Sequence, residues 1–377
     1  MRNPTQAHIS SSALRHNVAV LRDAAGGAPL CAVAKADAYG HGAARLAAAL
    51  RGAAIPFWGV ATLPEGLALR QLGVTAPILV FRPLGRYEPE RESAETLDAL
   101  VDADLRATVA SAAGADLLAR RAARRRRTAR VHLKVNTGMN RNGCPAEDAL
   151  SLARRIAAQP FLECEGVYSH FAAADEPDLG SAHGQLAAFR AIVRELARHG
   201  LRPSLCHMAN TGAVFNLRAA RFDMVRPGIG LYGYGGAAIR GSRRLRPALR
   251  LDAPVVLTRR LPAGASCGYG LAFTARRPTR IGLLPIGYAD GYDRRLSNGG
   301  PASFGRRLLR VIGRVSMDLT MVDLTDAPEA AEGARICLIS ERRADPHSVE
   351  SLAARLGTIP HEITCALGPR IDRVPAP

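Results

Sequence analysis

The sequence predicts an α/β protein with two domains, an N-terminal (β/α)8 barrel of the TIM type and a C-terminal mainly β domain. In about the first 230 residues, eight short apolar runs alternate with helix-like stretches, the pattern of a closed parallel barrel. After about Gly241 the pattern changes to short strand-like runs separated by Gly, Pro and Asp. A chain of 377 residues is long enough for both parts. We therefore place the barrel at residues 8–240 and the second domain at 241–377, to which residues 1–7 can add.

The elements of the barrel follow from apolar periodicity. Residues 12–22 carry Leu14, Val18 and Leu21 on one side and predict an amphipathic helix. Strands are expected at residues 30–34, 57–62, 77–81, 105–110, 130–136, 164–170, 204–208 and 222–226. Helices are expected between them, in an Ala/Leu-rich stretch that ends near Leu50 and at residues 64–72, 112–124, 146–158 and 184–199. The active site of such a barrel lies at the C-terminal ends of its strands.

The second domain is expected to be built mainly from strands. These lie at residues 251–257, 280–285, 308–311, 320–324 and 335–339, and only residues 346–356 have a helical pattern. No linker-like sequence separates the two domains. We therefore expect them to pack closely.

Composition narrows the class of protein. The net charge of +18 is densest at residues 120–130, which we interpret as a solvated helix end or loop. Aromatic residues make up only 5%, too few for base-stacking platforms, so we infer no nucleic-acid function. No apolar run approaches the roughly 20 residues of a membrane span. The N-terminus has no apolar signal region, and the seven cysteines have neither paired nor metal-ligand spacing, so we expect a cytoplasmic protein without a metal.

The chain has only two lysines, Lys35 and Lys134, among its 51 Lys and Arg residues. Arginine stays protonated, whereas a lysine amine can lose its proton, act as a base and bond covalently to a carbonyl group. Both lysines are therefore candidates for chemistry. Lys35 directly follows the first expected strand.

Polar residues gather at the expected strand ends, which meet at one mouth of the barrel. They are Lys35, Tyr39, Lys134, Asn136, Arg141, His170, His207, Asn210, Thr211 and Arg226. The turn at residues 228–230 has the usual phosphate position of such barrels, and Thr211 can add a hydroxyl. A lysine beside a phosphate site suggests pyridoxal phosphate attached to Lys35. A phosphosugar enzyme with a reactive lysine uses the same barrel and remains an alternative function. For Lys35 itself, the alternative is a structural role in a buried ion pair.

Seven motifs resemble the alanine racemase family of pyridoxal-phosphate enzymes. They are AVAKADAYGHG around Lys35, HLKVNTGMNRNG around Arg141, GVYSHFAAADE around His170, FDMVRPGIGLYG around Arg226, CGYGLAF around Tyr269, LPIGYADGY around Tyr288 and GRVSMDLTMVDLT around Met317. They occur in the family's order and cover nearly the whole chain. The resemblance implies the barrel and β domain expected above, in a head-to-tail homodimer.

The resemblance also implies roles for individual residues. Lys35 would hold the cofactor and act as one base, and Tyr269 of the partner subunit would be the other. Racemisation needs such a pair, because a proton leaves one face of the α-carbon and another returns to the opposite face. Arg226 would face the pyridine nitrogen and, with His170, would act as a relay.

The remaining roles concern the phosphate and the substrate. Tyr39, Thr211, Gly228 and Ile229 would hold the phosphate. Arg141 would bind the substrate carboxylate with help from the backbone N–H of Met317, and Tyr288 would line the entrance. The lysine that corresponds to Lys134 is often carbamylated in the family, and a carbamate would orient Arg141.

One position departs from the family pattern. His361 stands where the family usually has a tyrosine that contacts the phosphate and borders the substrate side chain. We therefore expect alanine racemisation with appreciable activity on serine or another small amino acid. The product would be D-alanine for peptidoglycan or L-alanine for catabolism. A decarboxylase of the same domain plan is the alternative, although Tyr269 between two glycines argues against it.

Overall fold

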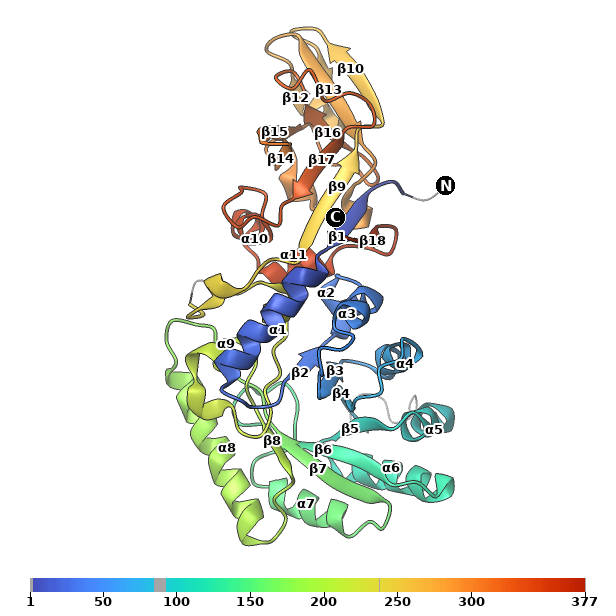
Figure 1. The fold of residues 1–377 in the computed structure, drawn as a ribbon, viewed down its shortest axis with the longest axis vertical. Helices are drawn as coiled ribbons and strands as arrows, with labels where there is room; N and C mark the ends of the chain where they lie inside the picture. The colour runs from blue at the N-terminus through green and yellow to red at the C-terminus, as the bar shows by residue number, and fades with distance from the viewer. Residues whose placement is uncertain (1–2, 85–92, 237, 377) are drawn as a thin grey trace.

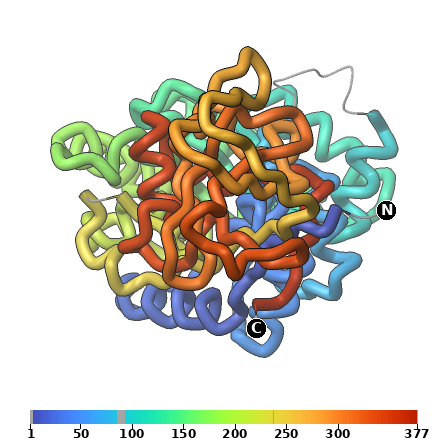
Figure 2. Tube along the Cα trace, turned by 90° about the horizontal axis from the view of Figure 1, so that it is seen from above, coloured from blue at the N-terminus to red at the C-terminus, as the bar shows by residue number. Residues whose placement is uncertain are grey.

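The computed structural model describes residues 3–84, 93–236 and 238–376 of the chain. Within these ranges it has a lower part built from a curled parallel sheet with helices outside it, and an upper part built mainly from β-strands (Figure 1). The view from above places the upper part over one end of the curled sheet (Figure 2). The predicted α/β fold is confirmed.

The curled sheet has seven parallel strands in sequence order. They are β2 (Cys31–Val33), β3 (Phe57–Val60), β4 (Ile78–Pro83), β5 (Leu105–Val109), β6 (Ala129–Lys134), β7 (Leu162–Tyr168) and β8 (Leu205–His207). Each corresponds to one of the first seven expected strands. Their side chains are largely buried, as apolar runs covered on both faces require.

The eighth expected strand, at residues 222–226, is wrong as a regular strand. These residues make only isolated parallel bridges, Met224 to His207 and Val225 to Leu30. The bridges still join the last strand to the first, and Cys31 N donates to Val225 O at 2.8 Å. The segment stays short because Phe222 has a φ of +46° and Pro227 offers no N–H to a ladder. The barrel is therefore closed by bridges in place of a full strand.

Helices cover the outside of the barrel (Figure 1). They are α1 (Ser11–Ala25), α3 (Ala43–Ala49), α4 (Leu63–Gln71), α5 (Ala94–Asp102), α6 (Ala112–Arg125), α7 (Ala149–Ala157), α8 (Gly180–Arg198) and the short α9 (Thr211–Asn216). Serine caps begin several of them: Ser10 Oγ accepts from Ala13 N, and Ser111 Oγ accepts from Gly114 N. Within the described residues, no helix is long and apolar enough to cross a membrane.

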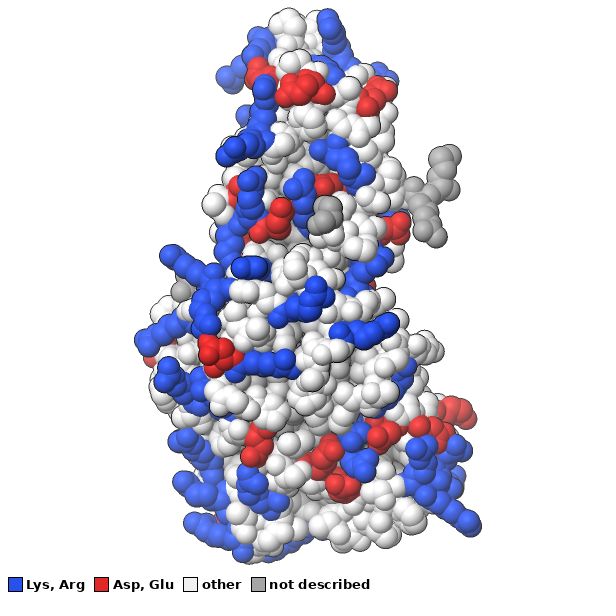
Figure 3. Space-filling view, viewed as in Figure 1, with Lys and Arg blue, Asp and Glu red and all other residues white. Residues whose placement is uncertain are grey.

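The arginine-rich stretch at residues 120–130 runs from the end of α6 into β6. Its arginines pair with acidic residues from α5 and the neighbouring strands: Arg121 with Asp98 at 2.5 Å and Arg125 with Asp102 at 2.5 Å. Figure 3 shows acidic side chains among the basic ones at this end of the barrel. Part of the local positive charge is therefore balanced within the fold.

The upper part contains a nine-stranded sheet in the order β10, β13, β16, β15, β14, β17, β9, β1, β18. The bounds are β1 (Gln6–Ile9), β9 (Leu249–Pro254), β10 (Leu257–Leu261), β13 (Thr279–Leu284), β14 (Pro301–Phe304), β15 (Arg307–Ile312), β16 (Thr320–Asp323), β17 (Arg335–Ile339) and β18 (Asp372–Pro375), and a separate hairpin joins β11 (Ser266–Cys267) to β12 (Phe273–Thr274). The N-terminal strand β1 pairs with β9 and β18.

Two helices accompany this sheet, α10 (Val349–Leu356) and α11 (Pro360–Cys365). The expectation of a single helix here is therefore wrong. The six residues of α11 are too few for an apolar period to be read from sequence. Pro360 occupies its first turn, where its missing N–H has no helical partner to lose.

Candidate active site

A cavity of about 630 Å³ opens at the C-terminal ends of the barrel strands. Eleven residues singled out from the sequence line it: Lys35, Tyr39, Lys134, Arg141, His170, Asn210, Thr211, Arg226, Gly228, Ile229 and His361. They come from the ends of β2, β6, β7 and β8, from the segment at residues 226–229 and from α11. The topology thus brings residues more than 300 positions apart into one site.

Lys35 begins a left-handed turn labelled α2 (Lys35–Tyr39). Four successive residues, Ala36 to Tyr39, have φ between 49° and 55°, a region that costs roughly 1–2 kcal/mol for each L-residue. Contacts from outside hold the turn: Glu65 Oε1 accepts from Ala36 N at 2.7 Å, and its Oε2 accepts from the backbone that follows β3. The turn brings the Lys35 amine within 5.8 Å of the Tyr39 ring centroid.

The helix α11 packs directly on this turn. A Cβ at Gly40 would lie 1.9 Å from the carbonyl oxygen of Thr364, so only glycine permits this contact. His361 consequently reaches the cavity, with its ring 5.8 Å from that of Tyr39. Its Nδ1 atom is buried and has no hydrogen-bond partner among the described residues. This histidine therefore lines the cavity and has a buried ring nitrogen without a hydrogen-bond partner in the described part of the chain.

The turn after residue 226 is organised by Thr211. Its hydroxyl oxygen accepts from Gly228 N at 3.1 Å and from Gly230 N at 3.2 Å. Side chains are excluded here, because a Cβ at Gly228 would lie 2.3 Å from the Tyr39 hydroxyl and one at Gly230 would lie 2.6 Å from Thr211 Cγ2. The backbone of the turn is thereby left accessible from the cavity.

Five cationic side chains line the cavity, Lys35, Arg82, Lys134, Arg141 and Arg226, with one carboxylate, Asp175. Burial, followed by Arg226, Arg141 and Lys35, lowers the pKa of Lys134 to about 7. Burial and then Arg141 also lower the pKa of Lys35. Lys134 is 5% exposed, and its one recorded contact in the described part of the chain is with the face of Tyr168, 4.9 Å from the ring centroid. The excess positive charge suits an anionic ligand with more than one negative group.

Arg226 lies at the base of the cavity and is only 3% exposed. Its Nη1 donates to His207 Nδ1 at 2.6 Å, and its Nη2 donates to Ser169 O at 2.7 Å and to His170 Nδ1 at 3.2 Å. Burial and then Arg226 hold the pKa of His170 well below its usual value, so this imidazole is neutral. The guanidinium is thus fixed in one orientation.

Sequence reasoning missed Tyr168 at the end of β7. Its ring lies under Lys134 and, at 5.0 Å, under the guanidinium of Arg226, and it stacks on His207 with centroids 4.9 Å apart. Its hydroxyl bonds to the Thr108 hydroxyl at 2.8 Å, and burial raises its pKa to about 12. Its position two residues before His170 at a strand end was the available signal.

Neither Asn136 nor His207 lines this cavity, and three residues whose roles the resemblance implies also lie outside it: Tyr269, Tyr288 and Met317. They belong to the β domain and are exposed by 71%, 42% and 53%. Tyr269 lies between Gly268 and Gly270, which both have positive φ. Segments 287–289 and 316–317 are joined by backbone hydrogen bonds, and Gly268 lies against Arg314. The three side chains therefore lie on neighbouring segments of one domain surface.

Known proteins resemble the chain over almost its whole length. The family model for the N-terminal domain of alanine racemase matches residues 9–235, and that for the C-terminal domain matches residues 248–375. Alanine racemase 2 of Caldanaerobacter subterraneus subsp. tengcongensis is 35% identical over 377 residues, covering 98% of this chain and 94% of the relative. Alanine racemase of Mycolicibacterium smegmatis is 38% identical over 379 residues, covering 99% and 95%.

Solved structures agree with these relatives. The alanine racemase from D-cycloserine-producing Streptomyces lavendulae has a TM-score of 0.90 at 34% identity and covers 99% of this chain and 97% of its own. The alanine racemase from Bartonella henselae, solved with covalently bound pyridoxal phosphate, has a TM-score of 0.83 at 28% identity and covers 98% and 99%. With both family models matched and close to full coverage, the chain belongs to the alanine racemase family, whose members are amino-acid racemases.

Proposed function

We propose that this protein is a pyridoxal-phosphate-dependent alanine racemase that uses two bases, Lys35 and Tyr269 of the partner subunit. The observation that carries the proposal is the position of Lys35, one of two lysines in the chain, in a cavity with four further cations and a glycine turn. The racemase names of the relatives support the reaction.

The residues present fit the cofactor. Its phosphate would meet the backbone of the turn at residues 228–230, the Thr211 hydroxyl and the Tyr39 hydroxyl, at the point where a side chain at Gly228 has no room. The unpartnered Nδ1 of His361 offers one more polar atom. Covalent attachment to an amine, as in the Bartonella henselae relative, would fall to Lys35.

When bound, pyridoxal phosphate withdraws electrons from the α-carbon of the amino acid and so makes its proton acidic. Lys35 then accepts or returns this proton at Nζ on one face. Burial and the neighbouring Arg141 lower the pKa of the Lys35 amine, which favours the neutral form that a base requires. A second base is needed on the opposite face, and Tyr269 of the partner subunit would supply it.

A head-to-tail dimer accounts for the exposed side chains of the β domain. Tyr269, Leu271, Tyr288 and Met317 are large, apolar or aromatic, and exposed on this chain. Such side chains grouped on one surface are typical of an interface. If this surface covers the cavity of a second copy, Tyr269 gains its place opposite Lys35, Tyr288 lines the entrance, and the Met317 N–H reaches the substrate.

Two arginines would contact the substrate and the cofactor. The planar fork of Arg141 suits the substrate carboxylate. Arg226 would donate a hydrogen bond to the pyridine nitrogen without giving up its proton, so the ring withdraws electrons less strongly and side reactions are restrained. His170 accepts from Arg226 and would relay this contact.

Carbamylation of Lys134 would reduce the surplus of positive charge. An unmodified ammonium next to Arg141 and Arg226 is repelled, and its pKa of about 7 reflects burial and these neighbours. A carbamate carries a negative charge and would orient Arg141 by a charge-assisted hydrogen bond.

Substrate range and cellular role complete the proposal. We expect activity on serine as well as alanine because of His361, and supply of D-alanine for peptidoglycan or of L-alanine for catabolism. None of the seven cysteines, which all lie in the described part of the chain, forms a disulfide, in keeping with a cytoplasmic enzyme. No feature in the described part of the chain favours the alternative, a decarboxylase with the same two domains.

The test uses the purified protein and the variant Lys35→Arg. We expect a yellow absorbance band that borohydride abolishes, and exchange of the α-proton of alanine for deuterium without release of carbon dioxide. Lys35→Arg keeps the charge but should lose both the covalent cofactor and turnover. A colourless wild type, or carbon dioxide release that matches substrate consumption, would overturn the proposal.

A further inference from the structure

Arg226 is a buried cation that touches no carboxylate among the described residues. Its partners are two backbone carbonyls, the Nδ1 atoms of His207 and His170, and the face of Tyr168. Four other cations line the cavity, and Asp175, the one carboxylate in its lining, makes no hydrogen bond or ion pair with Arg226 in the described part of the chain. Because an uncompensated buried charge is strongly destabilising, the negative charge that balances this arginine has to be sought further away.

A hydrogen-bonded chain leads from Arg226 through the barrel core to such a charge. His207 Nε2 lies 2.8 Å from His132 Nδ1, and His132 Nε2 lies 3.0 Å from Glu165 Oε2. Both histidines are fully buried. Glu165 lies on β7 and is therefore the first carboxylate reached from Arg226 along this chain.

The direction of every hydrogen bond in the chain follows from Arg226. A guanidinium only donates, so His207 Nδ1 must accept and its proton must lie on Nε2. That Nε2–H donates to His132 Nδ1, which places the proton of His132 on Nε2 as well. The last proton then points at Glu165, an ionised acceptor. One tautomer of each histidine satisfies all three bonds.

The charges agree with this assignment. Burial and then Arg226 hold the pKa of His207 well below its usual value, and burial also lowers the pKa of His132, so both rings are neutral. Burial opposes ionisation of Glu165, but hydrogen bonds from His132 and Arg106 still hold the pKa of its carboxyl at about 2. The chain therefore joins one fixed cation to one fixed anion through two neutral rings.

We propose that Glu165 is the remote counter-ion of Arg226 and that it positions this guanidinium for the cofactor through His132 and His207. The inference rests on the proposed function, since the cofactor is what Arg226 would meet. Glu165 is a positioning residue, because it acts only through other side chains. Polarised hydrogen-bond chains of this kind are stronger than their separate links.

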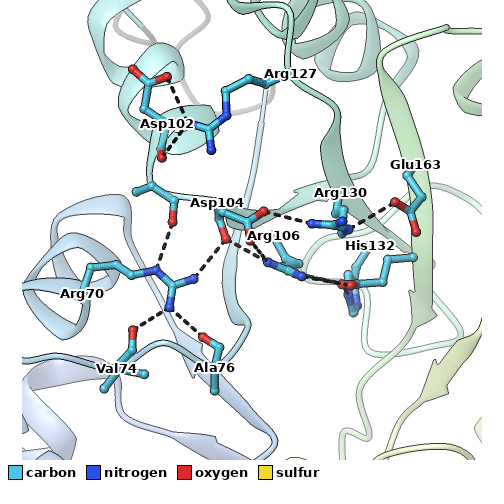
Figure 4. Close-up of polar contacts among 12 residues, drawn as sticks. Arg70, Val74, Ala76, Asp102, Asp104, Arg106, Arg127, Arg130, His132 and Glu163 are labelled. Carbon is cyan, nitrogen blue, oxygen red and sulfur yellow. Dashed lines mark hydrogen bonds and ion pairs between the residues drawn. The ribbon is translucent and has the colours of Figure 1, made fainter.

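A purely structural role for Glu165 has to be separated from this one. Arg106 Nε lies 3.1 Å from Glu165 Oε2, and Arg106 also pairs with Asp104 at 2.8 Å. Figure 4 shows His132 at the end of a network in which Arg106, Asp104, Arg130 and Glu163 follow one another across the base of the barrel. Glu165 could therefore matter only as one member of that network.

The experiment compares Glu165→Gln and Glu165→Leu with two controls. Glu163→Gln removes an acid from the same strand that is paired with Arg130 and touches neither histidine. Arg106→Gln removes the network partner of Glu165 but leaves its charge. The full-length protein is labelled with ¹⁵N-histidine and measured as isolated, after removal of the cofactor, and during titration with pyridoxal phosphate.

In the wild type we expect neutral His132 and His207 with their protons on Nε2. Glu165→Gln should shift the Nδ1 resonance of His207 and weaken cofactor binding about tenfold, which corresponds to the ~1.5 kcal/mol typical of a hydrogen bond to a charged group. Glu165→Leu should do more, and both controls should leave the resonance and the affinity near wild type. Glu165→Gln keeps the side-chain volume, so the test stands if the leucine variant does not fold.

Three results would overturn the inference: a proton on Nδ1 of His207 in the wild type, an unchanged His207 resonance in Glu165→Gln, or an equal change in Arg106→Gln. The resonances of the cofactor-free protein do not depend on the proposed function. If the histidines have these tautomers but the protein has no racemase activity, the proposed function is contradicted. The inference that Glu165 is the counter-ion of Arg226 still holds in that case.

Discussion

The hydroxyl of Tyr39 lies 2.3 Å from the point where a Cβ of residue 228 would stand. The left-handed turn after β2 is therefore in contact with the turn at residues 228–230. A side chain at residue 228 is excluded by lack of space beside Tyr39. Tyr39 is nearly fully buried and has little freedom to move away.

Gly228→Ala should therefore displace Tyr39 and weaken cofactor binding. Forcing one methyl group into a tight site costs about 1–3 kcal/mol, which corresponds to roughly a five- to 150-fold higher dissociation constant. Titration followed by the cofactor absorbance measures it. Gly184→Ala is the matched control, because it lies in α8 with nothing within 4 Å of its Cβ position. This control should bind the cofactor normally and be more stable by up to ~1 kcal/mol.

A double variant identifies the cause. Tyr39→Phe removes the atom that the new methyl group meets. The double variant of Gly228→Ala and Tyr39→Phe should therefore bind the cofactor more tightly than the sum of the two single effects on the binding free energy predicts. Normal binding by Gly228→Ala alone would contradict the proposed phosphate position.

The sequence was sufficient for those features that depend on local patterns. Apolar runs marked the seven strands of the sheet, and the rule that sites lie at strand C-termini gathered Lys35, Lys134, His170 and Arg226. The left-handed turn was not predictable, because Ala36 and Ala38 have no intrinsic preference for positive φ. Contacts from Glu65 and α11, far away in the sequence, impose it.

The same reason explains the other differences. The bridges at Met224 and Val225 replace a strand because Phe222 adopts a left-handed conformation that no pattern signals. Tyr168 has the sequence of a core tyrosine, and its contacts with two cations arise only when the fold places its ring beside Lys134 of β6 and Arg226. Tertiary contacts decide these features, so one sequence without its fold does not reveal them.

Mixed dimers test whether Lys35 and Tyr269 come from different subunits. Tyr269→Phe should keep the yellow cofactor yet racemise poorly, by about two orders of magnitude or more. Lys35→Ala should be inactive. A dimer of one chain of each kind contains one site with both defects and one intact site, so coexpression with separate affinity tags should restore about half of the wild-type activity per dimer.

The result distinguishes two arrangements. If both residues of a site came from one chain, each site of the mixed dimer would keep one defect, and activity would stay at the level of the single variants. The matched control mixes Lys35→Ala with Lys134→Gln, whose defects lie in the same cavity of one chain. In that mixed dimer each site keeps one defect, because both lysines line the cavity of their own chain, so the activity should stay at the average of the two single variants.

Carbon dioxide should bind covalently to Lys134. The neutral amine nitrogen attacks the carbon of CO₂, an N–C bond forms and a proton is released. Since the pKa of this lysine is lowered to about 7 by burial and by Arg226, its neutral form is scarce at pH 6 and dominant at pH 8. At a fixed pressure of ¹³CO₂ the carbamate signal in ¹³C NMR should therefore rise between about pH 6 and pH 8.

Variants of the two lysines identify which of them carries the carbamate. Lys134→Gln should abolish the side-chain carbamate and retain only the signal of the α-amino group, and its activity should fall because Arg141 loses its orienting partner. A carbamate signal that survives in Lys134→Gln and disappears in Lys35→Arg would place the modification on the wrong residue. A plain lysine at saturating bicarbonate would exclude the modification.

The choice between alanine and serine should depend on His361. This imidazole lines the cavity and lies against Tyr39 with a ring separation of 5.8 Å. A phenol is longer than an imidazole and would fill space near the substrate side chain. His361→Tyr should therefore lower kcat/KM for serine relative to alanine by about fivefold or more, since one extra heavy atom in a close pocket is worth about 1–3 kcal/mol. His183→Tyr, the same substitution on the exposed face of α8, should leave the ratio unchanged. Equal ratios in wild type and His361→Tyr would show that this position does not select the substrate, and the pocket would then have to be bounded by residues of the second subunit.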